Sequence, residues 1–148
     1  MKKRLKDIYI IEDDENLRDS IATQLEDFFP DLDIVGASGT RLKAMVECWE
    51  LEPDLAIFDI GLPDIYGLEI LHFFKAKFPK IKILIYSGIA DEQTADIAKL
   101  SEADGFVTKK SGMSEIRKAI TTIKDGGHYI SPELENLGMP QKDLAILN

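Results

Sequence analysis

The sequence is poor in cysteine and in basic residues. Cys48 is the single cysteine among 148 residues, which excludes an internal disulfide framework and a cysteine-based zinc site, and is typical of a reducing, cytosolic compartment. Lysine and arginine number 18 against 27 aspartates and glutamates, so the formal net charge is −9 and the surface repels nucleic acid and anionic lipid. A free-standing DNA-binding domain is therefore not expected from these residues.

Long apolar runs are also missing. The basic start, residues 1–6, leads into Ile8-Tyr9-Ile10-Ile11 and then into four acids, which is too short and too charged for a signal peptide or a membrane span. We therefore expect a cytoplasmic protein without a membrane partner.

What the chain does contain is an alternation of short apolar runs with helical periodicities. At 45% apolar residues, a chain of this length can bury the core of one domain. The alternation indicates βα units around a parallel sheet, because strands covered on both faces read as continuous apolar runs. The runs predict five strands, at residues 8–11, 34–37, 55–58, 81–86 and 105–108.

Apolar stripes at helical spacing predict helices between and after these strands. The segment after the fourth strand, 92–101, has a thin apolar face, so we expect its helix to be the most loosely held. The other stripes are Leu17, Ile21, Leu25 and Phe28; Leu42, Met45, Val46 and Trp49; Leu68, Leu71, Phe74 and Phe78; and Met113, Ile116, Ile120 and Ile123.

The chain after the last of these helices reads as an irregular tail. Gly126-Gly127 ends the helix, and Ser131-Pro132 predicts an N-cap followed by a first helical position. We do not expect a sixth βα unit here. A break at residues 138–140 precedes a short helix-like run, 141–148.

Ligands of open α/β sheets bind beyond the carboxyl ends of the strands, and that rule selects a set of polar residues. If the first and third strands are neighbours, their carboxylates crowd together, and a hard cation such as Mg²⁺ relieves the repulsion. A carboxylate in this position can accept a phosphoryl group, with an ammonium to neutralise its oxygens and a hydroxyl to contact the product. The residues are Glu12 and Asp13 after the first strand, Asp59 after the third, Ser87 after the fourth and Lys109 after the fifth.

Each of these residues also has an ordinary structural interpretation. The acids after the first strand are typical of a helix start, and we expect Asp14 to cap that helix. Asp59 is typical of a turn before the loop at 61–64, and Ser87 and Lys109 are common loop and surface residues. The joint placement of all of them at strand ends favours the functional interpretation.

At these positions the chain resembles the CheY-like receiver domain of bacterial two-component response regulators, over about residues 5–130. The segments that carry the resemblance are 10–18, 53–67, 83–88 and 103–109. It implies a flavodoxin-like (βα)5 fold with a parallel five-stranded sheet in the order 2-1-3-4-5. It also implies that Asp59 is the phosphoacceptor, that Glu12, Asp13, Asp59 and the carbonyl of Gly61 hold Mg²⁺, and that Ser87, Phe106 and Lys109 bind the phosphoryl group and switch the domain.

The chain departs from the usual family pattern at three positions. Gly61 and Gly88 stand where larger side chains are common, which leaves both flanks of the phosphoryl site open to water and implies a short-lived aspartyl phosphate. Phe106 keeps the ring of the commoner tyrosine without its hydroxyl.

Residues 126–134 are similar to the junction of the NarL/FixJ (LuxR-type) regulators, and 139–148 to the start of their helix-turn-helix domain. We therefore predict a receiver domain at 1–127, followed at 128–148 by a linker and the start of a helix-turn-helix domain that is truncated or absent. We interpret the chain as a fragment of a transcription factor that contacts DNA only through the missing domain; the alternative is a receiver-only form.

The implied function is phosphoacceptance from a sensor histidine kinase, with dimerisation or release of an attached domain as the output and no separate enzymatic substrate. A pseudo-receiver that acts only by protein binding is one alternative, although the acids, Asp59 and Lys109 are all present. A haloacid-dehalogenase-like phosphohydrolase needs a second acid where Gly61 stands, and a flavodoxin-like carrier would repel FMN with its acidic first loop.

Overall fold

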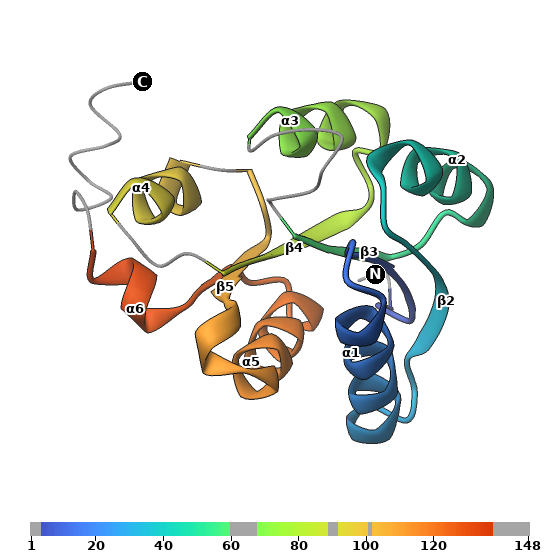
Figure 1. The fold of residues 1–148 in the computed structure, drawn as a ribbon, viewed down its shortest axis with the longest axis horizontal. Helices are drawn as coiled ribbons and strands as arrows, with labels where there is room; N and C mark the ends of the chain where they lie inside the picture. The colour runs from blue at the N-terminus through green and yellow to red at the C-terminus, as the bar shows by residue number, and fades with distance from the viewer. Residues whose placement is uncertain (1–3, 60–67, 89–91, 101, 138–148) are drawn as a thin grey trace.

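The computed structural model describes residues 4–59, 68–88, 92–100 and 102–137. In these ranges, strands and helices alternate from the start of the chain to residue 135 (Figure 1). The strands are β1 (Asp7–Ile11), β2 (Asp33–Ser38), β3 (Leu55–Asp59), β4 (Lys82–Ser87), β5 (Gly105–Thr108) and β6 (Tyr129–Ile130). The helices are α1 (Glu15–Phe28), α2 (Arg41–Leu51), α3 (Leu68–Lys77), α4 (Glu92–Leu100), α5 (Met113–Lys124) and α6 (Pro132–Glu135), with a short 3₁₀ turn at Lys109–Ser111.

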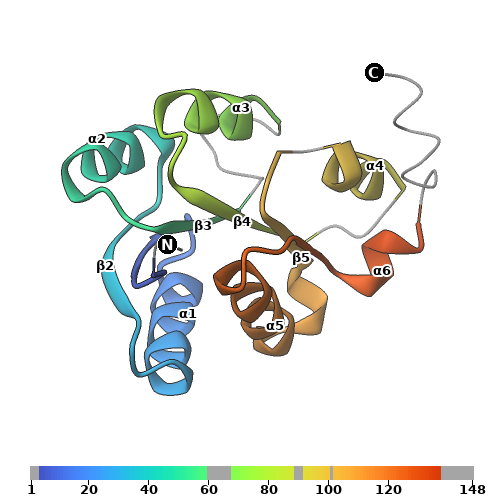
Figure 2. The same ribbon diagram turned by 180° about the vertical axis from the view of Figure 1, so that it is seen from behind.

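The strands form one parallel sheet in the order β2-β1-β3-β4-β5-β6. Helices α2, α3 and α4 lie on one face of the sheet, and α1 and α5 lie on the other (Figures 1 and 2). Every residue of β3 is buried, as its continuous apolar run predicts for a central strand. The α/β class and the order of the first five strands are therefore confirmed. No helix in the described ranges is long and apolar enough to cross a membrane.

The sheet has six strands and not the predicted five, and the prediction that no further βα unit follows α5 is wrong. β6 pairs in parallel with β5, with Gly105 opposite Tyr129 and Phe106 opposite Ile130, and α6 follows it. Gly126 supplies the positive φ of the turn that returns the chain to the sheet. A strand of two residues is too short to appear as an apolar run, which is why the sequence pattern misses it. Ser131 is the N-cap of α6 and Pro132 its first residue, as predicted.

The predicted apolar stripe of α2 is also wrong. Leu42, Val46 and Trp49 are exposed, and of the predicted stripe only Met45 packs, partly buried, against the core. The fully buried side chains of the helix are instead Ala44 and Cys48. Tyr9 of β1 lies in the same apolar cluster as Ala44 and Cys48 and is itself fully buried. Its large ring belongs to the cluster beneath the helix, and the fully buried side chains of α2 that join that cluster are small.

The remaining helices follow their predicted stripes more closely. In α1, Ile21 and Leu25 are buried and Phe28 is half exposed; in α5, Ile116, Ile120 and Ile123 are buried. Asp14 caps α1 as expected, since its carboxylate accepts hydrogen bonds from the backbone of Asn16 (3.0 Å) and Leu17 (3.2 Å). The residues predicted at 138–148 lie outside the described ranges.

Buried Asp104 joins α3, β4 and β5. Its carboxylate accepts a hydrogen bond from the backbone N–H of Ile83 at 2.9 Å and forms ion pairs with Lys75 at 3.2 Å and Lys82 at 3.7 Å. Lys75 is itself largely buried, so the loss of its partner leaves an uncompensated charge in a poorly hydrated place.

We predict that Asp104→Ala lowers the free energy of unfolding by about 2–4 kcal/mol. The substitution removes the counter-ion of Lys75, whose ammonium keeps its hydrogen bond to the carbonyl of Ile81 at 3.3 Å, and the acceptor of the Ile83 N–H. Urea denaturation followed by circular dichroism measures the change. Asp31→Ala, which removes the fully solvated Arg4–Asp31 pair, is the matched control and should cost less than about 0.5 kcal/mol. Equal effects of the two substitutions would contradict this account of Asp104.

Candidate functional site

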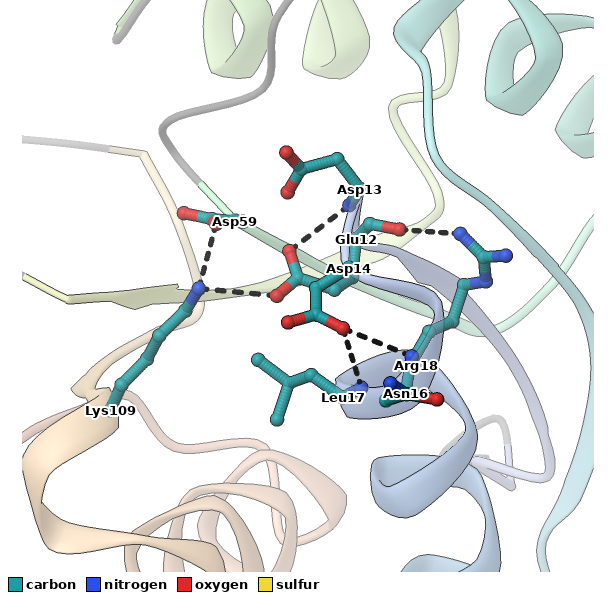
Figure 3. Close-up of polar contacts among 8 residues, drawn as sticks. All are labelled: Glu12, Asp13, Asp14, Asn16, Leu17, Arg18, Asp59 and Lys109. Carbon is teal, nitrogen blue, oxygen red and sulfur yellow. Dashed lines mark hydrogen bonds and ion pairs between the residues drawn. The ribbon is translucent and has the colours of Figure 1, made fainter.

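A cluster of charged side chains lies beyond the carboxyl ends of β1, β3 and β5 (Figure 3). Glu12 and Asp13 follow β1, Asp59 is the last residue of β3, and Lys109 follows β5. The predicted crowding of carboxylates required the first and third strands to be neighbours. The sheet order places β1 directly beside β3, so this requirement is met. Carboxylate oxygens of Glu12, Asp13 and Asp59 lie within 4.8 Å of one another.

Lys109 is the cation that holds this cluster together. Its Nζ lies 2.8 Å from Oδ2 of Asp59 and 3.2 Å from Oε1 of Glu12. Glu12 is only 1% exposed and Asp59 9%, whereas Asp13 is open to solvent. The arrangement therefore consists of two buried carboxylates, one solvated carboxylate and one ammonium that neutralises only part of their charge.

The main chain around Glu12 is fixed from two sides. Its N–H donates to the carbonyl of Ser38 in β2 at 2.9 Å, and its carbonyl accepts a hydrogen bond from Nη1 of Arg18 at 2.7 Å. Arg18 lies one turn into α1, so it ties the start of that helix to the end of β1 (Figure 3). Arg18 is the last residue of the segment 10–18 that carries the family resemblance, and the sequence alone assigns it no role. Its spacing of six residues from Glu12 was the available signal.

The electrostatics of the cluster favour binding of a further cation. Burial, together with the charge of nearby Asp59, raises the pKa of Glu12 to about 7, against the opposing effect of Lys109, which lowers it. Burial lowers the pKa of Lys109, yet its hydrogen bond to Asp59 and the charges of Asp59 and Glu12 outweigh burial, so the pKa is raised overall. Near neutral pH, Lys109 is therefore charged and Glu12 is close to its titration midpoint.

Tyr86 is a member of the site that sequence reasoning missed. It lies opposite Asp59 in the β3–β4 register, it is 1% exposed, and Nζ of Lys109 lies 4.9 Å from the centre of its ring. Burial, followed by the charges of Glu12 and Asp59, raises the pKa of its phenol. Its place directly before Ser87 at the end of a strand was the only signal in the sequence. The face of the ring therefore makes a cation–π interaction with the Lys109 ammonium.

The other predicted residues lie in different surroundings. Ser87 is buried at the end of β4. Phe106 is buried on the opposite face of the sheet from Tyr86, in a cluster with Ala95 and Ala98 of α4 and Leu134 of α6. Gly61, the fourth predicted contact to the metal, lies outside the described residues.

The donor set suits a hard divalent cation. Mg²⁺ prefers one or two carboxylates together with water and phosphate oxygens, and Glu12, Asp13 and Asp59 offer carboxylate oxygens at the rim of the sheet. The raised pKa of Glu12 shows that Lys109 alone does not offset burial and the neighbouring negative charge, a deficit that a divalent ion would remove.

Comparison with known proteins identifies the family of this chain. The family model described as "Response regulator receiver domain" matches residues 8–121. Among curated proteins, the transcriptional regulatory protein LnrK of Bacillus subtilis (strain 168) is 28% identical over 127 residues, which cover 86% of this chain and 57% of LnrK. The DNA-binding transcriptional activator DevR/DosR of Mycobacterium tuberculosis is 28% identical over 119 residues, covering 80% of this chain and 54% of that protein. The chain thus spans little more than half the length of these relatives.

Solved structures agree in fold. The isolated REC domain of RcsB from Salmonella enterica serovar Typhimurium, in the presence of phosphomimetic BeF3⁻, superposes with a TM-score of 0.85 at 16% identity, covering 93% of this chain and 100% of that one. A LuxR-family DNA-binding response regulator from Staphylococcus aureus superposes with a TM-score of 0.71 at 28% identity, covering 81% and 99%. With the family model matching most of its length, this chain belongs to the family of response regulator receiver domains.

Proposed function

We propose that the chain accepts a phosphoryl group on Asp59 from a sensor histidine kinase, in a reaction that requires Mg²⁺, and that phosphorylation switches its output. The observation that carries the proposal is the geometry at Asp59, whose carboxylate is 2.8 Å from the Lys109 ammonium and within 4.8 Å of the carboxylate oxygens of Glu12 and Asp13. Family membership leaves the phosphohydrolase and flavodoxin-like alternatives without support.

In the proposed reaction, an oxygen of the Asp59 carboxylate forms the new bond to phosphorus while the P–N bond of the kinase phosphohistidine breaks. The electron pair of that bond stays on the departing imidazole nitrogen. Lys109, already in contact with Asp59, moves its ammonium onto the transferred oxygens and neutralises part of their charge. Tyr86 and Glu12 hold the ammonium at this position before transfer. When bound by Glu12, Asp13 and Asp59, Mg²⁺ supplies charge neutralisation to the phosphoryl oxygens.

The switch would act through β5, which has contacts on both faces of the sheet. Phosphorylation adds about −1.5 to −2 charge at a site with little room. Ser87, at the end of β4, would move its hydroxyl toward the phosphoryl oxygens, and Phe106, which is already buried, would repack against α4. The output we propose is control of transcription through a DNA-binding domain outside this chain, in a cytoplasmic protein whose partners include its kinase and a second copy of itself. The relatives, named as transcriptional regulators, support this choice.

The first prediction of the proposed function concerns Asp59, the phosphoacceptor. Acetyl phosphate with Mg²⁺ should label the wild-type chain, and Asp59→Asn should abolish the labelling, because the amide oxygen is not a nucleophile toward phosphorus. Phosphate-affinity electrophoresis measures the product. Asp14→Asn is the matched control: it removes a nearby carboxylate, but asparagine caps α1 equally well, so labelling should persist. Labelling that survives in Asp59→Asn would place the acceptor elsewhere.

The second prediction follows from the pKa of Glu12. Folding raises this pKa from 4.5 to about 7, so protons compete with the cation for the Glu12 carboxylate below that pH. The apparent Mg²⁺ affinity should therefore rise with pH and level off above about 7, with a slope approaching tenfold per pH unit on the acid side. Isothermal titration calorimetry from pH 5.5 to 8.5, at steps of about half a unit, measures it. Glu12→Gln should weaken binding and flatten this dependence; an unchanged slope would contradict the assignment of the titration to Glu12.

The third prediction concerns Gly88. Among the residues that the structure describes, a Cβ built at this position meets only the Cδ of Lys109, at 3.8 Å, which is ordinary van der Waals contact. Gly88→Ala should therefore fold normally and, by narrowing the path of water to the phosphoryl group, slow its hydrolysis several-fold. The decay of radiolabelled phosphoprotein after removal of the donor measures the lifetime. A lifetime equal to that of the wild type would show that this flank does not control water access.

A further inference from the structure

Helix α2 carries an apolar stripe whose large side chains are mostly exposed. Leu42, Val46 and Trp49 are spaced by four and three residues, so they lie on one stripe of the helix. Their exposed fractions are 67%, 54% and 71%, and Trp49 is the single tryptophan of the chain. Side chains of this size exposed side by side are characteristic of a protein docking surface.

The stripe points away from the core, because the opposite side of α2 holds the buried residues Ala44 and Cys48. Its apolar surface continues toward the end of α3, where the ring of Phe78, the residue after the helix, lies 6.4 Å from that of Trp49. A hollow of about 300 Å³ lies between the two helices beside the stripe and is large enough for side chains of a partner. It is lined by Met45, Val46, Trp49, Glu50, Lys77 and Phe78.

The charges beside the stripe point to the identity of the partner. Lys43 and Glu50 both lie about a quarter turn from the stripe on the same flank of α2, one near each end of the helix. Both are exposed, and Lys43 reaches Glu47 on its own helix only at 3.9 Å. A positive charge at one end and a negative charge at the other make this surface complementary to itself when a second copy is turned by 180°.

Two copies of α2 can pack with their axes antiparallel or parallel, and the positions of the charges on the helix distinguish the two arrangements. In an antiparallel pair, the same flank of each helix meets, so Lys43 of each copy faces Glu50 of the other, twice per dimer. A parallel pair instead places Lys43 against the flank that carries Met45 and Arg41, where the charges repel. The pattern therefore favours an antiparallel arrangement about a two-fold axis.

We propose that this chain self-associates through α2, with Leu42, Val46 and Trp49 packed against the same stripe of a second copy and both Lys43–Glu50 pairs along one edge of the interface. The interface requires no phosphoryl group, because none of its residues belongs to the cluster at Asp59. Helix α2 also lies on the opposite face of the sheet from α1 and α5, so the pairing leaves those helices accessible (Figures 1 and 2).

Association of the full chain can be followed by sedimentation velocity across a concentration series, without any phosphodonor. We expect a monomer–dimer equilibrium in which the emission of Trp49 shifts to shorter wavelength as the dimer forms, and Trp49→Ala should abolish the dimer. Asp59→Asn should associate like the wild type, so failure of this proposal is distinguishable from failure of phosphoacceptance. A monomer at every concentration, or a dimer that Trp49→Ala leaves intact, would overturn the proposal.

Charge reversal tests the orientation. Lys43→Glu or Glu50→Lys alone should raise the dissociation constant roughly tenfold, since each turns two attractive pairs into two repulsive ones, and the double reversal should restore association. Lys118→Glu makes the same charge change as Lys43→Glu on α5 and should have no effect. A double reversal that associates no better than the single variants would exclude the antiparallel pairing.

Discussion

The contact between Lys109 and the carboxylates of Asp59 and Glu12 is the interaction on which the site depends. Two buried acids at the ends of neighbouring strands are unfavourable without it, and the parallel sheet leaves them no alternative position. The surrounding structure supports this one cation: Arg18 and Ser38 fix the main chain of Glu12, and the ring of Tyr86 lies under the ammonium. Lys109 neutralises only part of the negative charge of the carboxylates, as the raised pKa of Glu12 indicates. The remaining negative charge favours binding of a divalent cation by Glu12, Asp13 and Asp59.

Strand β5 links this rim to the other side of the molecule. Lys109 follows it directly, Val107 belongs to the cluster between the sheet and α1 and α5, and Phe106 belongs to the cluster beneath α4. Thr108 makes two hydrogen bonds to the segment that contains α6. Its backbone N–H donates to the hydroxyl of Ser131, and its hydroxyl donates to the carboxylate of Glu133. A displacement of Lys109 therefore acts on a strand whose neighbours are α4 and the segment from β6 to α6, which is why we assign the output to this side.

Much of the fold and site was predictable from sequence, and the failures have physical causes. Continuous apolar runs located β1 to β5, and the rule that ligands bind at strand ends brought Glu12, Asp59 and Lys109 together. The apolar periodicity predicted the wrong buried face for α2, because it records which side chains are apolar and not how much space lies beneath the helix. The ring of Tyr9 belongs to the cluster in that space. Tyr86 contacts the Lys109 ammonium with the face of its ring, and Arg18 donates a hydrogen bond to the backbone carbonyl of Glu12. Neither contact can be recognised in the sequence before the fold is known.

The pairing of β6 with β5 also determines how other chains can approach the sheet. An exposed edge strand offers unpaired backbone groups to which a foreign strand can add, and β5 would be such an edge without β6. In the described part of the chain, that side of the sheet ends instead in a strand of two residues, Tyr129 and Ile130. Ser131, which follows, donates its N–H to the carbonyl of Phe106, and the chain then enters α6 at Pro132, which has no N–H to donate. The segment thus protects the domain against intermolecular β-addition, so proteins that bind at this end must recognise side chains and helices, not the backbone of the sheet.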